Sequence, residues 1–104
     1  MYGTSLVLTQ QARSFIKKSL EEIIPTLKPG EVSQYRLARS KLKETDIFVD
    51  GIIMRCFENA LNYKASVTVY KLERIVYEDI AENIKKQREN FQFRAMSRLG
   101  LVAG

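Results

Sequence analysis

Histidine is absent from this sequence of 104 residues, and cysteine occurs only once, as Cys56. Histidine is the commonest general base and the commonest metal ligand, so its absence removes the usual catalytic and zinc-binding constellations. A single cysteine cannot form a disulfide within the chain, which fits a reducing compartment such as the cytoplasm. Cys56 lies among apolar residues at helical spacing, and we expect it to be a small buried side chain.

Glycine-rich loops and long apolar runs are also missing. The five glycines are scattered, so no loop of the sequence is suited to hold a phosphate group. No stretch approaches the roughly 18 apolar residues of a membrane span, and the first residues lack the charged start and apolar run of a signal peptide. We therefore expect a non-enzymatic, cytoplasmic protein that binds no cofactor and no metal ion and has no membrane partner.

The composition is that of one globular domain. Hydrophobic residues make up 45% and charged residues 28% of the sequence, and these ordinary values argue against disorder. The length suits a single domain over residues 1–104 with one core. Within it, residues 91–104 are apolar and basic together. We expect them to be either a frayed end or a segment that docks on a protein partner through residues 91–102.

The formal net charge of +5 is modest, but the basic residues are clustered. One cluster has four basic residues and no acid, and the other has five basic residues and one acid. Their members are Arg36, Arg39, Lys41 and Lys43, and then Lys85, Lys86, Arg88, Arg94 and Arg98. Such clustering favours a polyanion or an acidic partner, whereas the alternative is a pair of solvated helix faces.

Apolar residues spaced by three and four positions predict a mainly α fold with three to four helices. The first helix begins after Thr9, a good N-cap, and is ended or kinked by Pro25. The last helix covers about 72–90, and its apolar side stops after Ile84. Residues 65–70 alternate apolar and polar side chains, which predicts a short strand or a simple lead into the last helix. At most a small β element is expected, and a strand over 65–70 would pair with residues 4–8 or with a second copy of the chain.

Two further helices, about 33–42 and 47–62, are predicted around a four-residue break. Ser33 is the candidate N-cap of the first, and Thr45 or Asp46 that of the second. Two helices joined this tightly, the first after a Pro-Gly turn, predict a helix-turn-helix-like core.

The stretch from residue 27 to 61 resembles the winged helix-turn-helix of GntR-type regulators. Pro29-Gly30, Leu37-Ala38 and Val49 stand where that module has its turn, its short helix and the start of its recognition helix. The resemblance covers about a third of the chain, and it implies a winged-helix-like fold that binds double-stranded DNA.

These patterns lead to the hypothesis of a small DNA-binding regulator or accessory factor of the kind that a phage or plasmid encodes. It is expected to act as a homodimer through its last helix. Arg55 is expected to contact a base, and the other contacts are expected to be made with the DNA backbone. The expected nucleic-acid-binding residues are Arg36, Arg39, Lys41, Lys43, Arg55, Lys85, Lys86 and Arg88.

Two alternatives remain open. The first is a protein–protein adaptor or assembly component, including a phage-encoded one that docks on a host machine. The second is an RNA-binding protein whose aromatic side chains stack on bases. The candidates for stacking are Tyr35, Tyr70, Phe91 and Phe93.

Overall fold

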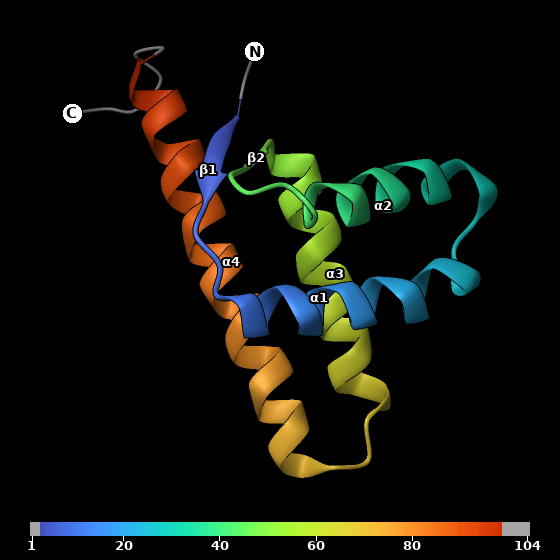
Figure 1. Cartoon of the computed structure of the whole chain (residues 1–104). Coiled ribbons are helices and arrows are strands. Elements are labelled where there is room, and N and C mark those ends of the chain that lie inside the picture. Colours follow the sequence, from blue (N-terminus) through green and yellow to red (C-terminus); the bar gives the residue numbers. More distant parts are fainter. Residues whose placement is uncertain (1–2, 99–104) are drawn as a thin grey trace.

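A computed structural model describes the backbone of residues 3–98 and the side chains of residues 3–94. Four α-helices, one 3₁₀ helix and two short strands follow one another along this part of the chain (Figure 1). They are β1 (Thr4–Leu6), α1 (Gln10–Ile23), η1 (Ile24–Thr26), α2 (Pro29–Lys41), β2 (Ile47–Val49), α3 (Gly51–Val67) and α4 (Lys71–Arg98). The expectation of a mainly α fold with a small β element is confirmed.

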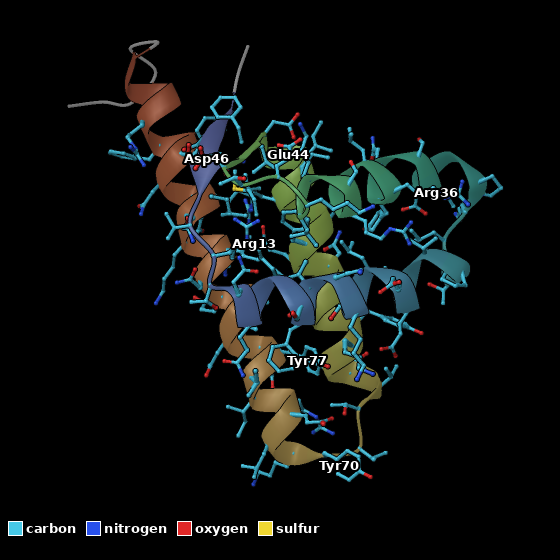
Figure 2. All side chains as sticks on the ribbon, viewed as in Figure 1. Arg13, Arg36, Glu44, Asp46, Tyr70 and Tyr77 are labelled. Carbon is cyan, nitrogen blue, oxygen red and sulfur yellow. The ribbon has the colours of Figure 1, made fainter. Side chains whose placement is uncertain are left out.

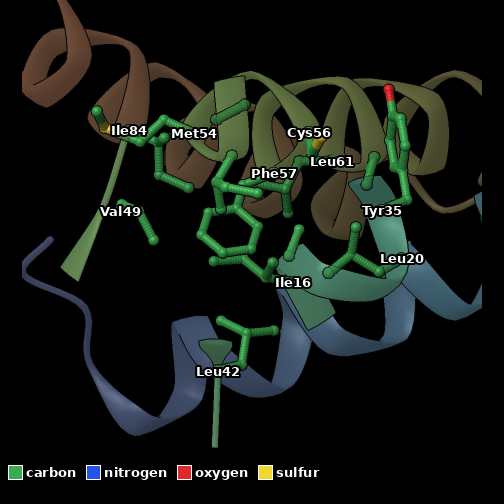
Figure 3. Close-up of a cluster of buried hydrophobic side chains, with 14 of the residues drawn as sticks. Ile16, Leu20, Tyr35, Leu42, Val49, Met54, Cys56, Phe57, Leu61 and Ile84 are labelled. Atoms are coloured by element: carbon green, nitrogen blue, oxygen red, sulfur yellow. The ribbon is translucent and has the colours of Figure 1, made fainter. Parts of the chain in front are cut away.

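Helices α3 and α4 form a long antiparallel hairpin, and α1 crosses it (Figure 1). Helix α3 is central, because α1, α2 and α4 all pack against it. Its apolar side chains meet those of α1 and α2 around Phe57, Ile16 and Leu20, which are fully buried (Figure 3). No helix of the described part of the chain is long and apolar enough to cross a membrane.

Helix α1 begins and ends where its sequence predicts. The hydroxyl of Thr9 accepts a hydrogen bond from the backbone N–H of Ala12, 3.0 Å away, as an N-cap does. Pro25 has no N–H to continue the helix, so the chain tightens into η1 after Ile23.

Helix α2 begins at Pro29, four residues earlier than predicted, so Ser33 is an interior residue and does not cap it. Proline suits the first turn of a helix, where a backbone N–H has no partner in any case. At the other end, the guanidinium of Arg13 donates hydrogen bonds to the backbone carbonyls of Leu42, Glu44 and Thr45. This side chain from α1 thereby fixes the chain that leaves α2.

The predicted start of the third helix is wrong. Residues Ile47–Val49 form β2, which pairs antiparallel with β1 so that Ser5 faces Phe48. Helix α3 starts only at Gly51, and its N-cap is Asp50, whose carboxylate accepts from the N–H of Ile53 at 2.9 Å. Nine residues including a strand thus separate α2 from α3, so the tight four-residue break of a helix-turn-helix is not present.

The predicted strand over 65–70 is also wrong. Residues 65–67 form the last turn of α3, and Thr68–Tyr70 lead directly into α4, which was the alternative interpretation. The predicted strand near residues 4–8 exists as β1, but its partner is β2. Helix α4 continues past the predicted end at 90 to Arg98, so the first part of the expected tail is helical. Residues 99–104 of that tail lie outside the described residues.

Candidate interaction surfaces

The described residues offer no metal site, since no group of three or more cysteine, aspartate or glutamate side chains lies close enough to hold an ion. The lone cysteine, Cys56, is buried in the core. Burial raises the pKa of its thiol to about 11, so it stays protonated at neutral pH. A protonated, enclosed thiol is not a nucleophile.

The basic residues of α2 fall on two flanks of the helix. Arg36 and Arg39 are three residues apart on α2 and therefore share a face, and Lys43 follows in the turn after the helix ends at Lys41; we call these three residues the basic row. None of the three makes an ion pair with a described residue. Lys41 is two residues from both Arg39 and Lys43, so it projects from another flank, and its ammonium lies 3.6 Å from the carboxylate of Glu44.

Helix α3 is poorly placed to act as a recognition helix. Its neighbours α1, α2 and α4 leave only one row of side chains exposed. That row consists of Ile52, Arg55, Asn59, Asn62 and Ser66. A recognition helix needs a broad free face to enter a major groove, which is about 12 Å wide and holds a single helix. Arg55 is exposed on this row, but no other basic side chain belongs to it.

Arg88 is not available to a nucleic acid, and its prediction as a contact is wrong. Only 7% of the residue is exposed, because its guanidinium lies between α3 and α4. It donates two hydrogen bonds to the carboxylate of Glu58, at 2.6 and 3.0 Å, and a third to the amide oxygen of Gln92. These bonds to Glu58 hold the pKa of Arg88 above its usual value. The pair links the two helices of the hairpin.

The other predicted contacts on α4 do not gather into one patch. Lys85 lines a shallow pocket that also contains Glu78 and Glu82, so acids surround it. Lys86 is exposed on the outer side of the helix.

Two of the aromatic residues proposed to stack on bases are not free to do so. Tyr35 is buried, and Phe91 packs partly buried against the core.

Exposed apolar side chains concentrate where α3 turns into α4. Six of the eleven large hydrophobic side chains that are exposed in the described chain fall within residues 67–76. Three of them lie at the end of α3 and in the turn that follows it, where Val67 is 50%, Val69 83% and Tyr70 67% exposed. We call these three residues the hairpin tip, and Tyr70 lies at this end of the molecule in Figure 2.

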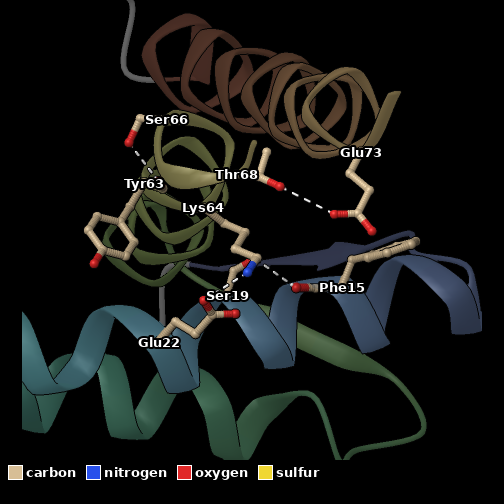
Figure 4. Close-up of polar contacts among 8 residues, drawn as sticks. All are labelled: Phe15, Ser19, Glu22, Tyr63, Lys64, Ser66, Thr68 and Glu73. Atoms are coloured by element: carbon tan, nitrogen blue, oxygen red, sulfur yellow. Dashed lines mark hydrogen bonds and ion pairs between the residues drawn. The ribbon is translucent and has the colours of Figure 1, made fainter. Parts of the chain in front are cut away.

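Hydrogen bonds hold the turn beneath the hairpin tip in one conformation. The hydroxyl of Thr68 donates to the carboxylate of Glu73 at 3.2 Å (Figure 4), and the guanidinium of Arg74 donates to the carbonyl of Thr68 at 3.2 Å. Glu73 and Arg74, in the first turn of α4, are therefore both engaged with Thr68. Lys71 is the one charge near the tip that makes no hydrogen bond or ion pair with a described residue.

The base of the hairpin is braced by α1. The ring of Phe15 meets that of Tyr77 edge-on, with centroids 5.4 Å apart. Lys64 donates to the carboxylate of Glu22 at 2.8 Å (Figure 4). Its ammonium also lies over the Tyr77 ring, 6.0 Å from the ring centroid. The hairpin tip thus projects from a rigid support.

The apolar side chains of the hairpin tip are visible in the sequence, but they belong to an alternating pattern that is also typical of a strand. The alternation over 65–70 predicts a strand or a lead into the last helix, but it also places apolar side chains where a helical hairpin must turn.

Comparisons with protein-family models, with curated proteins and with solved structures found no match.

Proposed function

We propose that this protein is a non-enzymatic adaptor or assembly component that docks on another protein through the hairpin tip. The observation that carries the proposal is the exposure of Val67, Val69 and Tyr70 on a turn fixed by hydrogen bonds. Full burial of one such aliphatic side chain is worth roughly 1.5–3 kcal/mol. A turn that is already ordered loses little conformational entropy on binding, so most of that gain would remain.

The charges near the tip indicate the partner's chemistry. Lys71 is free of ion pairs with described residues, whereas Glu73 and Arg74 are engaged with Thr68. A complementary surface would therefore be an apolar pocket with an acidic rim. The apolar part would supply affinity, and the acidic rim would supply orientation and association rate.

Photo-crosslinking tests this proposal. A photoreactive phenylalanine analogue at position 70 should crosslink to one defined protein in cells that express the chain naturally, while the same analogue at the exposed position of Lys18 on α1 should not. Val69→Asp and Lys71→Glu should each reduce that crosslink without changing the circular dichroism spectrum. Equal crosslinking from both positions, or no effect of Val69→Asp, would refute docking through the tip.

A second candidate function is binding of DNA or another polyanion through the basic row of α2. The observation that favours it is that Arg36 and Arg39 share a face of α2, and Lys43 follows just after the helix, with no ion pair from any of the three to a described acid. Because the exposed row of α3 has Arg55 as its single basic side chain, such binding would depend on phosphate contacts of the basic row and would be insensitive to sequence. Its test is the salt dependence described in the Discussion.

A further inference from the structure

A second surface without a partner runs along the outer side of α4, opposite the core. The inner side of this helix buries Tyr77, Ala81 and Ile84. On the outer side, exposed residues recur at alternating spacings of three and four, as in the seam of a coiled coil. They are Leu72, Val76, Asp79, Asn83, Lys86, Asn90 and Phe93, which we call the α4 seam.

The residues of the α4 seam are all exposed, and Asp79 and Asn83 line an open pocket with Val7 and Leu8 of the chain after β1. Helix α4 forms one long edge of the molecule (Figure 1), and its substantial contacts are with α3 on the inner side and with β1. The chain after β1 borders the seam on one flank, where Gln87 exchanges two hydrogen bonds with the backbone of Val7 at 3.0 Å each. The helix has 28 residues and is about 42 Å long, enough for an extended contact with a second helix.

The chemistry of the α4 seam is self-complementary in one direction. Leu72, 80% exposed, and Phe93, 60% exposed, lie at equal distances along the helix from a point between Glu82 and Asn83. Asp79 and Lys86 lie at equal distances from the same point. A two-fold axis through that point would set each apolar end against the partner's other apolar end, and each aspartate against a lysine.

The charges along the whole helix agree with this direction. Residues 71–84 contain four acidic and two basic residues, whereas residues 85–98, apart from Arg88 with its internal partner Glu58, contain one acidic and four basic residues. Antiparallel pairing brings the acidic half of one helix to the basic half of the other. Parallel pairing would instead place Asp79 against Asp79 and Lys86 against Lys86, which is repulsive.

We infer that the protein forms an antiparallel homodimer through the α4 seam, centred between Glu82 and Asn83. The apolar ends supply the affinity, and the Asp79–Lys86 pairs across the two-fold axis set the direction. The inference is independent of the proposed docking through the hairpin tip, because it uses none of the tip's three residues. It also gives Leu72, Val76 and Phe93 a reason to be exposed in the isolated chain.

Charge reversal tests the pairing. By light scattering, the wild type should have about twice the chain mass of 12.0 kDa. Asp79→Lys and Lys86→Asp should each weaken dimerisation about tenfold or more, and the double variant should recover, because only it restores opposite charges across the axis. Both positions are exposed, so thermal unfolding of the dissociated chains should change little. A wild type that stays monomeric at its highest soluble concentration, or a double variant no better than the single ones, would overturn the inference.

Cysteine crosslinking tests the direction. Asn83→Cys lies near the proposed axis and should form a disulfide-linked dimer with its own copy under mild oxidation, whereas Leu72→Cys alone should not. Mixing Leu72→Cys with Phe93→Cys chains should give the mixed dimer. The wild type is the control, because its Cys56 is buried. Self-crosslinking of Leu72→Cys would show a parallel arrangement and overturn the inference. Val69→Asp at the hairpin tip should leave the dimer mass unchanged, which separates this result from a failure of the proposed docking.

Discussion

The guanidinium of Arg88 lies between α3 and α4, where the carboxylate of Glu58 accepts two hydrogen bonds from it. The side chains of the pair are 8% and 9% exposed, so water can stabilise neither charge if the other is removed. The sequence does not predict this pair, because it joins residues thirty positions apart. The basic residues around Arg88 and the helical spacing around Glu58 are local patterns and contain no sign of it. It forms because α3 and α4 pack side by side, which is a tertiary event.

Removing one partner of this pair should destabilise the fold strongly. Arg88→Ala leaves the Glu58 carboxylate buried without its cation, and the free energy of unfolding should fall by about 3–5 kcal/mol. Denaturant unfolding measures the loss. Lys85→Ala, an exposed change three residues away and outside the α4 seam, is the matched control and should cost little. The double variant Arg88→Met/Glu58→Leu should recover much of the loss, since no buried charge remains. An Arg88→Ala protein as stable as Lys85→Ala would contradict this account.

Single changes in the basic row should weaken polyanion binding uniformly, if the second candidate function holds. Arg39→Ala and Lys43→Ala each remove one cation that could neutralise a phosphate. Each should shallow the slope of log affinity against log salt by about one, equally on duplexes of different sequence. Fluorescence anisotropy at several salt concentrations gives the slope. Lys41→Ala is the control, because Lys41 lies on another flank beside Glu44. Wild-type protein that shows no salt-dependent binding would eliminate this candidate.

At the scale of elements, the sequence predicted helices where local signals agree and failed where pairing is long-range. Helix α1 has a capping Thr9, a regular apolar side and a terminating Pro25, and all three act within a few residues. Strand β2 depends on β1, more than forty residues earlier. Val49 fits the apolar side of a helix that continues through Ile53, and together with Ile47 it also fits the buried side of a strand, so the apolar pattern around Val49 did not decide between them.

The N-cap of α3 distinguishes the observed helix, which begins at Gly51, from the helix predicted to begin at about residue 47. Asp50→Ala should lower the free energy of unfolding by about 0.5–2 kcal/mol, because the N–H of Ile53 would lose its acceptor. Thr45→Ala and Asp46→Ala should change stability little, since both side chains are exposed and neither caps a helix. Denaturant unfolding of the three variants makes the comparison. A larger loss for Asp46→Ala than for Asp50→Ala would favour the helix start predicted from the sequence.

At the scale of the whole molecule, the three surfaces differ in how far the sequence alone could predict them. The shared face of Arg36 and Arg39 could be predicted from spacing on a single helix, whereas the hairpin tip and the α4 seam could not, because exposure depends on which helices pack together. Ile84 and Leu72 lie on one predicted apolar side, yet Ile84 is buried against α3 and Leu72 is exposed. If α4 pairs antiparallel with its copy, the two hairpin tips would lie at opposite ends of the dimer. Such a dimer could connect two copies of a partner, and its avidity would exceed the affinity of one tip.

Alkaline pH should destabilise the whole molecule. Burial raises the pKa of Tyr35, Tyr77 and Cys56, and a hydrogen bond to Glu22 raises that of Lys64. A raised folded-state pKa contributes stability that is present below the unfolded-state pKa and is lost as the pH rises through the folded-state pKa. For Cys56 this window runs from 9.0 to about 11, and the other three groups act in the same direction.

The free energy of unfolding should therefore fall steadily from about pH 9 to about pH 11, as measured by denaturant unfolding at each pH. Cys56→Ala serves as the internal comparison: it costs packing at every pH, but its stability should decline less steeply over this window, because the thiol no longer contributes. The thiol of the wild type should also resist a thiol reagent in the folded protein below that window and react once the protein unfolds. Stability that stays level up to about pH 11 would mean that these groups are not protonated more strongly in the folded chain than in the unfolded one.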